Sequence, residues 1–291
     1  MQKKQYLDEI QRLDPLKDHL RIVYLSAEYE FPWDGTRALE FALFRTYAVP
    51  SVSKILDQTE EFYKRPQKRY DDTSLIIAEL YENGYDSERG RAVLRNMNRQ
   101  HGRYSIANDD FIYVASTFVF EPPRWMERFA WRPMCKQEKL GLFYFWREVA
   151  HRMNIKNFPQ DYDDFERFNR NYEQQHFMYA ESNQRVGNAT VDLFLGWLLP
   201  RFMYPLGRPF IYALLDDSLI TAFGFKKPPA IFGWLAATSL KLRAGLVRML
   251  PARNKPALFT AKPHRSYPHG YTLDQIGPPS SVQHKETDNT A

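Results

Sequence analysis

The chain has very little cysteine and no long apolar run. Cys135 is the only cysteine among 291 residues, so no disulfide can form within the chain. Chains without disulfides are typical of reducing compartments, and a lone cysteine is more often a packing residue than a nucleophile. No apolar segment follows a basic start, and no stretch has the ~18 uninterrupted apolar residues that indicate a membrane-spanning helix. The sequence therefore predicts neither a signal peptide nor a transmembrane helix, and it favours the cytoplasm.

Glycine-rich phosphate loops and concentrated charge are also missing. The 13 glycines are scattered, and they form no Walker motif, no dinucleotide fingerprint and no Gly-x-Ser-x-Gly nucleophile elbow. The 40 Lys and Arg and 35 Asp and Glu are interspersed, whereas nucleic acid binding requires a basic stripe or an aromatic-basic motif. These absences exclude nucleic acid as a partner, and they predict that any redox cofactor is metal-based.

Aromatic residues are abundant, and helical periodicity dominates the chain. The 21 Phe, 18 Tyr and 6 Trp suit both a packed core and a wide apolar cavity. No alternating Val- and Ile-rich stretch indicates a sheet. We therefore predict an all-α protein with one domain over residues 1–276, followed by a polar, disordered tail over 277–291. Helices are expected at 4–29, 34–48, 66–83, 87–101, 109–119, 136–153, 162–185, 188–199 and 208–215.

Two consecutive helices bring an arginine, a threonine and a histidine together. Pro66 suits a first helical turn and residues 83–84 (Asn-Gly) supply a stop, so residues 66–83 form one helix. Arg69 and Thr73 lie four residues apart on it and share a face. Ser87 can cap the next helix, whose apolar face ends at His101. A buried histidine beside a cation and a hydroxyl is typical of an iron or haem ligand with polar groups nearby.

Each of these residues also has a structural interpretation. His101 could be a neutral core histidine that is hydrogen-bonded to a backbone carbonyl. Arg69 could form an ion pair with Asp72 or with one of the aspartates at 109 and 110. Thr73 could bond its own helix backbone. Spacing alone favours the structural interpretation of His101.

A second pattern indicates a rival metal site. Glu148 and His151, and likewise Glu173 and His176, form Glu-x-x-His motifs on two predicted helices that a short turn joins. Di-iron helical bundles use a pair of such motifs together with glutamates from two other helices. Three glutamates elsewhere could complete the set: Glu40, Glu79 and Glu121. Both motifs also suit solvated helix faces, because charged and amide side chains surround them.

Several motifs carry a family resemblance. They are residues 30–34 (EFPWD), 37–47 (RALEFALFRTY), 68–73 (KRYDDT), 98–101 (NRQH), 108–113 (NDDFIY), 120–125 (FEPPRW), 145–149 (FWREV) and 267–271 (YPHGY). Together they resemble the mpaB/rubber-oxygenase catalytic-domain family, and the match is specific to its fungal, endoplasmic-reticulum-bound branch. The bacterial latex clearing proteins share only the sparse Arg-x-x-x-Thr plus His pattern.

The resemblance implies a globin-like helical core with additional helices and a haem b that His101 ligates. Arg69 and Thr73 would then flank the haem and hold bound oxygen or a propionate. Asp72 stands where the latex enzymes can offer a lysine. It is a candidate catalytic base, with Glu61 as the other nearby carboxylate.

The function that the resemblance implies is an oxygenase of secondary, meroterpenoid metabolism. It would use dioxygen to cleave a C=C bond in a lipophilic isoprenoid or terpenoid side chain. It would work at the surface of the endoplasmic reticulum membrane, and residues 229–250, apolar first and basic later, suit peripheral membrane contact. Two alternatives stay open: a di-iron oxygenase that uses the Glu-x-x-His pair, and a non-catalytic accessory protein at the membrane surface.

Overall fold

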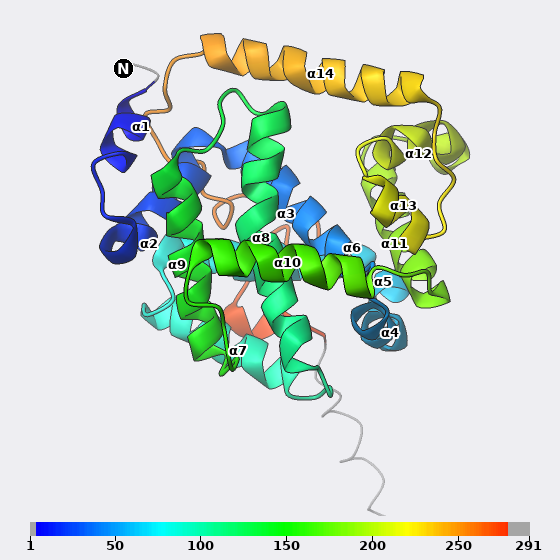
Figure 1. Ribbon diagram of the computed structural model, residues 1–291, viewed down its shortest axis with the longest axis horizontal. Coiled ribbons are helices and arrows are strands. Elements are labelled where there is room, and N and C mark those ends of the chain that lie inside the picture. Colours follow the sequence, from blue (N-terminus) through cyan, green and yellow to red (C-terminus); the bar gives the residue numbers. More distant parts are fainter. Residues whose placement is uncertain (1–3, 279–291) are drawn as a thin grey trace, which may run out of the picture.

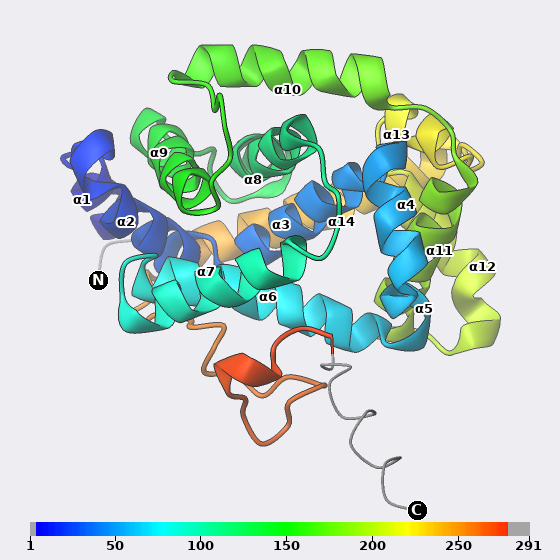
Figure 2. The same cartoon turned by 90° about the horizontal axis from the view of Figure 1, so that it is seen from below.

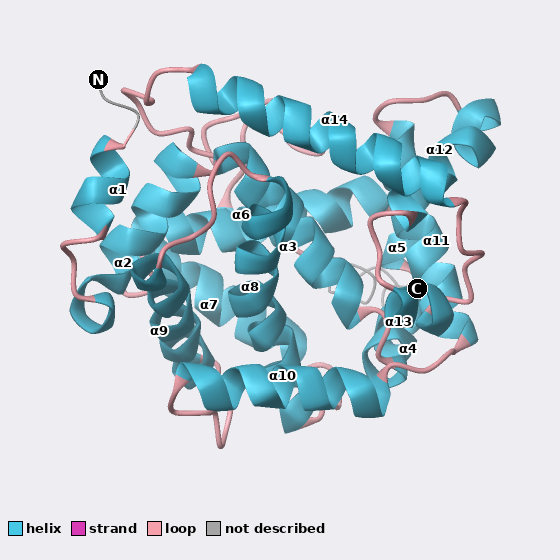
Figure 3. Cartoon of the chain, turned by 45° about the horizontal axis from the view of Figure 1, so that its top comes forward, coloured by secondary structure: helices cyan, strands magenta, loops and turns pink. Residues whose placement is uncertain are grey.

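The computed structural model describes residues 4–278, and within that range it contains helices and loops but no strand, so the all-α prediction is confirmed (Figure 3). The helices of the first half are α1 (Gln5–Ile10), α2 (Pro15–Leu25), η1 (Ser26–Glu30), α3 (Pro32–Thr46), α4 (Pro50–Thr59), α5 (Glu61–Lys64), α6 (Pro66–Asn83) and α7 (Glu88–His101). Those of the second half are α8 (Asn108–Phe129), α9 (Lys136–Arg152), α10 (Tyr162–His176), α11 (Glu181–Gly196), η2 (Arg201–Met203), α12 (Tyr204–Tyr212), α13 (Asp217–Ala222), α14 (Ala230–Met249) and η3 (Leu273–Gln275).

The helix pair α6 and α7 forms as its sequence signals predict. Pro66 occupies the first turn of α6, and Gly84 follows its end with φ at 75°. The Ser87 side chain accepts a hydrogen bond of 2.9 Å from the backbone N–H of Gly90, which is the expected N-terminal cap of α7. A Cβ on Gly90 would lie 2.0 Å from the Gly84 carbonyl oxygen, so glycine is required where the two helices join.

The central helix α8 is longer than expected. The sequence predicts a helix over 109–119, because a proline inside a helix removes an N–H donor and usually ends it. Here α8 continues through Pro122 and Pro123. The residues beyond them, including Trp125 and Phe129, are buried in the main core, and this burial offsets the lost hydrogen bonds.

Three other boundaries differ from the sequence expectation. The helix expected over 4–29 is divided, because Asp14 adopts an extended conformation before Pro15 and caps α2. The helix expected over 162–185 ends at His176, and a new helix begins at Glu181 and covers most of the helix expected over 188–199. The sequence did not predict α4, α5 or α13.

The helix α14 lies along one side of the molecule, across the top of Figure 1. It contacts α12, where the rings of Phe210 and Phe232 lie 5.0 Å apart, and Arg243 donates a hydrogen bond of 3.0 Å to Asp34 of α3. Most of its side chains stay outside the core.

The chain after α14 has no long helix and folds back beneath α6 and α7 (Figure 2). The amide of Asn96 on α7, for example, donates a hydrogen bond of 2.9 Å to the Ile276 carbonyl. The expected loss of periodicity beyond Pro251 is therefore confirmed. Of the tail predicted over 277–291, residues 279–291 lie outside the described part of the chain.

Candidate active site

Seven helices (α3 to α9) contribute to the wall of a cavity of about 260 Å³. Most of its wall is aliphatic and aromatic, with side chains such as Leu43, Ile76, Met97, Phe111 and Met153. The polar groups of the wall come mainly from α6, α7 and α8: Arg69, Asp72, Thr73, Gln100, His101 and Asp110. An apolar space with a few convergent polar groups is the usual form of a small-molecule site.

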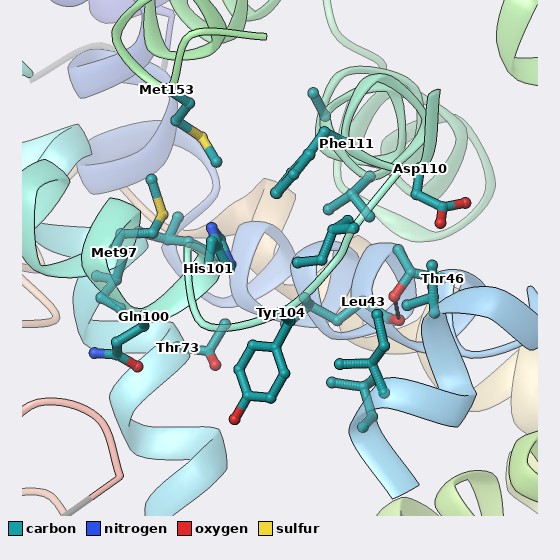
Figure 4. Close-up of a pocket in the computed structure, with 18 of the residues that line it drawn as sticks. Leu43, Thr46, Thr73, Met97, Gln100, His101, Tyr104, Asp110, Phe111 and Met153 are labelled. Atoms are coloured by element: carbon teal, nitrogen blue, oxygen red, sulfur yellow. Dashed lines mark hydrogen bonds between the residues drawn. The ribbon is translucent and has the colours of Figure 1, made fainter. Parts of the chain in front are cut away.

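His101 is the last residue of α7, and its ring faces the cavity near Phe111 and Met153 (Figure 4). Burial and, as a smaller cause, the nearby positive charge of Arg69 together lower the pKa of His101 to about 4, so the ring is neutral at pH 7. Its Nδ1 is buried and has no hydrogen-bond partner among residues 4–278. An ordinary core histidine would form a hydrogen bond to a backbone carbonyl, and Nδ1 of His101 forms no such bond within residues 4–278. A neutral ring with an unpaired nitrogen suits a metal ligand.

Arg69 and Thr73 meet on α6, as their spacing predicts. The Arg69 guanidinium donates to the Thr73 hydroxyl, which itself donates a hydrogen bond of 3.0 Å to the Arg69 carbonyl. The expected backbone bond of Thr73 is thus present together with the contact to Arg69. Arg69 forms no ion pair with a carboxylate in the described part of the chain; its Cζ lies 5.6 Å from the centre of the Phe62 ring. The cavity wall therefore carries a positive charge that no carboxylate neutralises.

The carboxylates of the wall are all engaged. Both oxygens of Asp72 accept hydrogen bonds of 2.9 Å from the Lys68 ammonium, and one also accepts a bond from the Tyr267 hydroxyl. Glu61 pairs with Arg65 on the adjoining turn. Asp110 accepts hydrogen bonds from Ser51 and Tyr172. The structure thus places Asp72 at the cavity, in a network that the sequence analysis did not foresee.

The two Glu-x-x-His motifs do not converge on a metal site. Glu173 forms an ion pair with Arg45, and His176 stacks on Tyr172 with 4.1 Å between ring centres. Glu148 pairs with Arg152 at 2.9 Å, and the His151 side chain is 51% exposed. Within residues 4–278, no group of three or more His, Cys, Asp or Glu side chains is placed to hold a metal ion. Within the described residues the di-iron ligand set is therefore not assembled, because arginines pair with both glutamates, His176 stacks on a tyrosine and His151 faces solvent.

Several residues in or beside the cavity wall were not among the site residues that the sequence predicted. Gln100, Tyr104 and residues 277–278 line the cavity beside His101. Lys68 stands next to Arg69 and holds Asp72. The four-residue spacing of Lys68 and Asp72 is a signal that could have revealed their pairing. The contribution of residues 277–278 depends on contacts across nearly the whole chain, which no local pattern encodes.

Residues 35–252 match the family model described as "ER-bound oxygenase mpaB/B'/Rubber oxygenase, catalytic domain". The chain belongs to this family. It is 28% identical over 252 residues to the ER-bound oxygenase mpaB' of Penicillium brevicompactum, a match that spans 80% of this chain and 59% of the relative's length. It is 27% identical over 239 residues to the ER-bound oxygenase mpaB of Penicillium roqueforti (strain FM164), across 75% of this chain and 80% of the relative.

Among solved structures, a latex clearing protein in the closed state has a similar fold. The TM-score is 0.54 and the sequence identity 13%, over 86% of this chain and 74% of the latex protein. At that identity the likeness concerns the fold alone. The family expected from the sequence motifs is confirmed, and the family is one of oxygenase catalytic domains.

Proposed function

We propose that this chain is an oxygenase that binds haem b through His101 and uses dioxygen to cleave a C=C bond in an isoprenoid or terpenoid side chain. The observation that carries the proposal is the neutral His101 ring at the wall of an apolar cavity, with an Nδ1 that no other residue in 4–278 pairs with. A single histidine suffices as the protein ligand of a haem iron.

The residues around His101 fit such a group. A haem presents a flat apolar surface with two carboxylates at one edge, and the wall combines apolar side chains with the unneutralised guanidinium of Arg69. Arg69 would hold dioxygen or a propionate, since a planar guanidinium donates to either. Bound haem would supply the chemistry that activates dioxygen.

The chain's own residues would bind and orient the substrate. The aliphatic and aromatic wall favours a lipophilic side chain and excludes water from it. The Thr73 hydroxyl, held by Arg69, would orient a polar group of the reactants. Asp72 would act as the base that takes an allylic proton onto a carboxylate oxygen, and Lys68 and Tyr267 fix its position.

We further propose that the protein works as a peripheral component at the endoplasmic reticulum membrane, in secondary metabolism of the meroterpenoid type. The mpaB and mpaB' relatives are named ER-bound. Apolar side chains on α14 are largely exposed, with Leu242 and Leu246 at 67% and Met249 at 83%. Residues 218–273 contain nine Lys and Arg but no Asp or Glu, which suits an anionic lipid surface. By length and composition alone α14 could also cross a membrane, so the mode of binding needs a direct test.

The haem proposal is tested by reconstituting purified protein with hemin and measuring the absorbance band near ~410 nm that haem b proteins show. Wild type should bind one haem per chain, whereas His101→Gly should bind none and regain the band when free imidazole is added. The matched control combines His151→Ala and His176→Ala and should keep full haem. A colourless wild type would favour the accessory role, and full haem in folded His101→Gly would eliminate this ligand.

A further inference from the structure

The described C-terminal segment forms part of the cavity wall. Residues 277 and 278 line the cavity beside Gln100, although the match to the family model ends at residue 252. This segment approaches from below α6 and α7, where η3 lies against α7 (Figure 2). We call residues 264–278 the C-terminal strap. The cavity is therefore completed by a part of the chain that the matched family region does not contain.

Lys68 is the main contact between the strap and α6. Its ammonium donates hydrogen bonds of 2.7 Å to the Tyr267 hydroxyl, 3.0 Å to the Gln275 carbonyl and 2.9 Å to the Gly277 carbonyl. The same ammonium binds both oxygens of Asp72. One charged group thus ties the strap backbone to a cavity carboxylate, and hydrogen bonds to a charged donor are among the stronger ones.

A second row of contacts lies on α7. The Asn96 amide, which is buried, donates to the carbonyls of Leu273 and Ile276 at 3.3 and 2.9 Å. The Gln100 amide donates to the Ile276 carbonyl at 3.3 Å. Gln100 is also the neighbour of His101 in the chain, so the strap is bound directly beside the candidate ligand.

Gly277 allows the strap to approach this closely. Its φ is 112°, a conformation that other residues rarely adopt. A Cβ at this position would lie 2.2 Å from Nε2 of Gln100. Any larger residue would have to displace either the strap or the Gln100 side chain.

We propose that the C-terminal strap is a specificity-determining wall of the substrate cavity and that Lys68 is the positioning residue that holds it. The wall would limit how long an apolar chain the cavity accepts and how quickly an apolar molecule enters. The statement about substrate length rests on the proposed function, whereas the statement about the wall rests on the contacts alone.

The test compares Lys68→Met and Gly277→Ala with a matched control, Lys64→Met, which removes a lysine from an exposed pair with Glu60 one helix earlier. Hydrogen–deuterium exchange of residues 264–278 and the entry rate of an apolar dye, Nile red, are measured on proteins whose circular dichroism matches wild type. Both test variants should exchange and take up dye about tenfold faster or more, since each loses contacts that hold the strap. Lys64→Met should behave as wild type.

In turnover assays with isoprenoid chains of different lengths, both variants should change the ratio of KM between long and short chains. Gly277→Ala should do so with little change in kcat, whereas Lys68→Met should also lower kcat, because it removes the ammonium that holds Asp72. If Gly277→Ala showed the hydrogen exchange and dye entry of wild type, the proposal that the strap forms a cavity wall would be wrong, even if Lys68→Met failed to fold. Faster exchange without any change in chain-length preference would overturn the specificity role. If wild type shows no turnover at all, the proposed function fails, while exchange and dye entry still decide the wall.

Discussion

At the scale of single residues, two polar side chains of the cavity wall, His101 and Arg69, lack within residues 4–278 partners that such groups usually have in a folded protein. Nδ1 of His101 is buried without a partner, and Arg69 lacks a carboxylate partner within the described residues. A buried polar group without a partner is costly, which is why most such groups in folded proteins are paired. Their coincidence at one wall is the strongest local indication that a ligand completes this site.

Arg69 and Thr73 should matter more for turnover than for cofactor content. Arg69→Ala should raise the barrier by roughly 2.7–4 kcal/mol, the range measured when a preorganised electrostatic contact is removed from an active site. Thr73→Val keeps the side-chain volume and removes only the hydroxyl, so a smaller loss is expected. The measurement is product formation from a farnesyl-bearing substrate with labelled dioxygen, at matched haem occupancy. Wild-type rates in both variants would show that the pair is structural.

The buried carboxyl group of Glu28 should make the folding stability depend on pH. Burial raises the pKa of Glu28 to about 8, with Glu82 adding to the shift and Lys262 opposing it, and no side-chain hydrogen bond or ion pair compensates within residues 4–278. The unfolded chain therefore loses this proton near pH 4.5, while the folded chain keeps it until about pH 8. Between these values folding stability falls as the pH rises, by as much as ~5 kcal/mol.

Glu28→Gln should accordingly stabilise the protein at pH 8 and have little effect at pH 4.5. Urea unfolding at both pH values measures the difference. Glu127→Gln serves as the control, because Glu127 is exposed on α8. An equal effect of Glu28→Gln at the two pH values would contradict the assigned environment.

At the scale of elements, α14 is an apolar helix that makes few contacts with the rest of the protein. Its large side chains such as Leu242 and Leu246 face away from the protein. Large exposed apolar patches on proteins usually mark an interaction surface. η2 and α12, the latter in contact with α14 through Phe210 and Phe232, expose two further apolar side chains: Phe202 is 81% exposed and Leu206 is 66% exposed.

Wild-type protein should float with liposomes that contain anionic lipid and be released by high salt or carbonate. The double variant Leu242→Glu/Leu246→Glu should lose this binding without unfolding, because both side chains already lie outside the core. Leu16→Glu is the matched control on α2, where Leu16 is 50% exposed. Release by detergent alone would instead indicate that α14 spans the bilayer.

The elements that the sequence predicted well are those whose signals are local. Residues 66–83 form α6 at the expected bounds, because Pro66 and Gly84 act within one turn of each end. The prediction was wrong where burial overrode a local rule, as at Pro122 and Pro123 in α8. It was also wrong where one turn interrupted a helical pattern, as after His176.

The candidate site was predicted in part for the same reason. The meeting of Arg69 and Thr73 follows from a four-residue spacing, and the orientation of His101 follows from the apolar stripe of α7. The hydrogen bond from Lys68 to Gly277 joins residues 209 positions apart. Nothing in the local pattern around either residue encodes that bond, so the wall it forms could be found only in the folded chain.

At the scale of the whole molecule, Arg45 of α3 joins helices that are distant in sequence. Its buried guanidinium pairs with Glu173 of α10 at 2.6 Å, with Asp216 next to α13 at 2.5 Å and with Glu121 of α8 at 3.4 Å. Breaking such a buried pair leaves carboxylates without a counter-charge.

Arg45→Met should therefore lower the free energy of unfolding by about 3–5 kcal/mol, as the removal of one partner from a buried ion pair does. Chemical denaturation at neutral pH measures the loss. The control Arg167→Met removes an arginine that is 68% exposed from a surface pair with Asp164, and it should cost under about 1 kcal/mol. Equal effects of the two substitutions would show that the Arg45 cluster is not a stabilising centre.

The absence of acidic residues from 218–273 separates positive from negative charge along the chain. The formal net charge of the chain is +5, and the nine basic residues of this segment leave a net −4 on all the rest. In the field of an anionic surface, the basic residues on α14, Lys241, Arg243 and Arg248, favour an approach with that side towards the surface. Electrostatic orientation of the protein before contact should then contribute to its association rate with the membrane, in addition to the contacts made after binding. That rate should fall steeply as added salt shortens the Debye length towards roughly 8–10 Å.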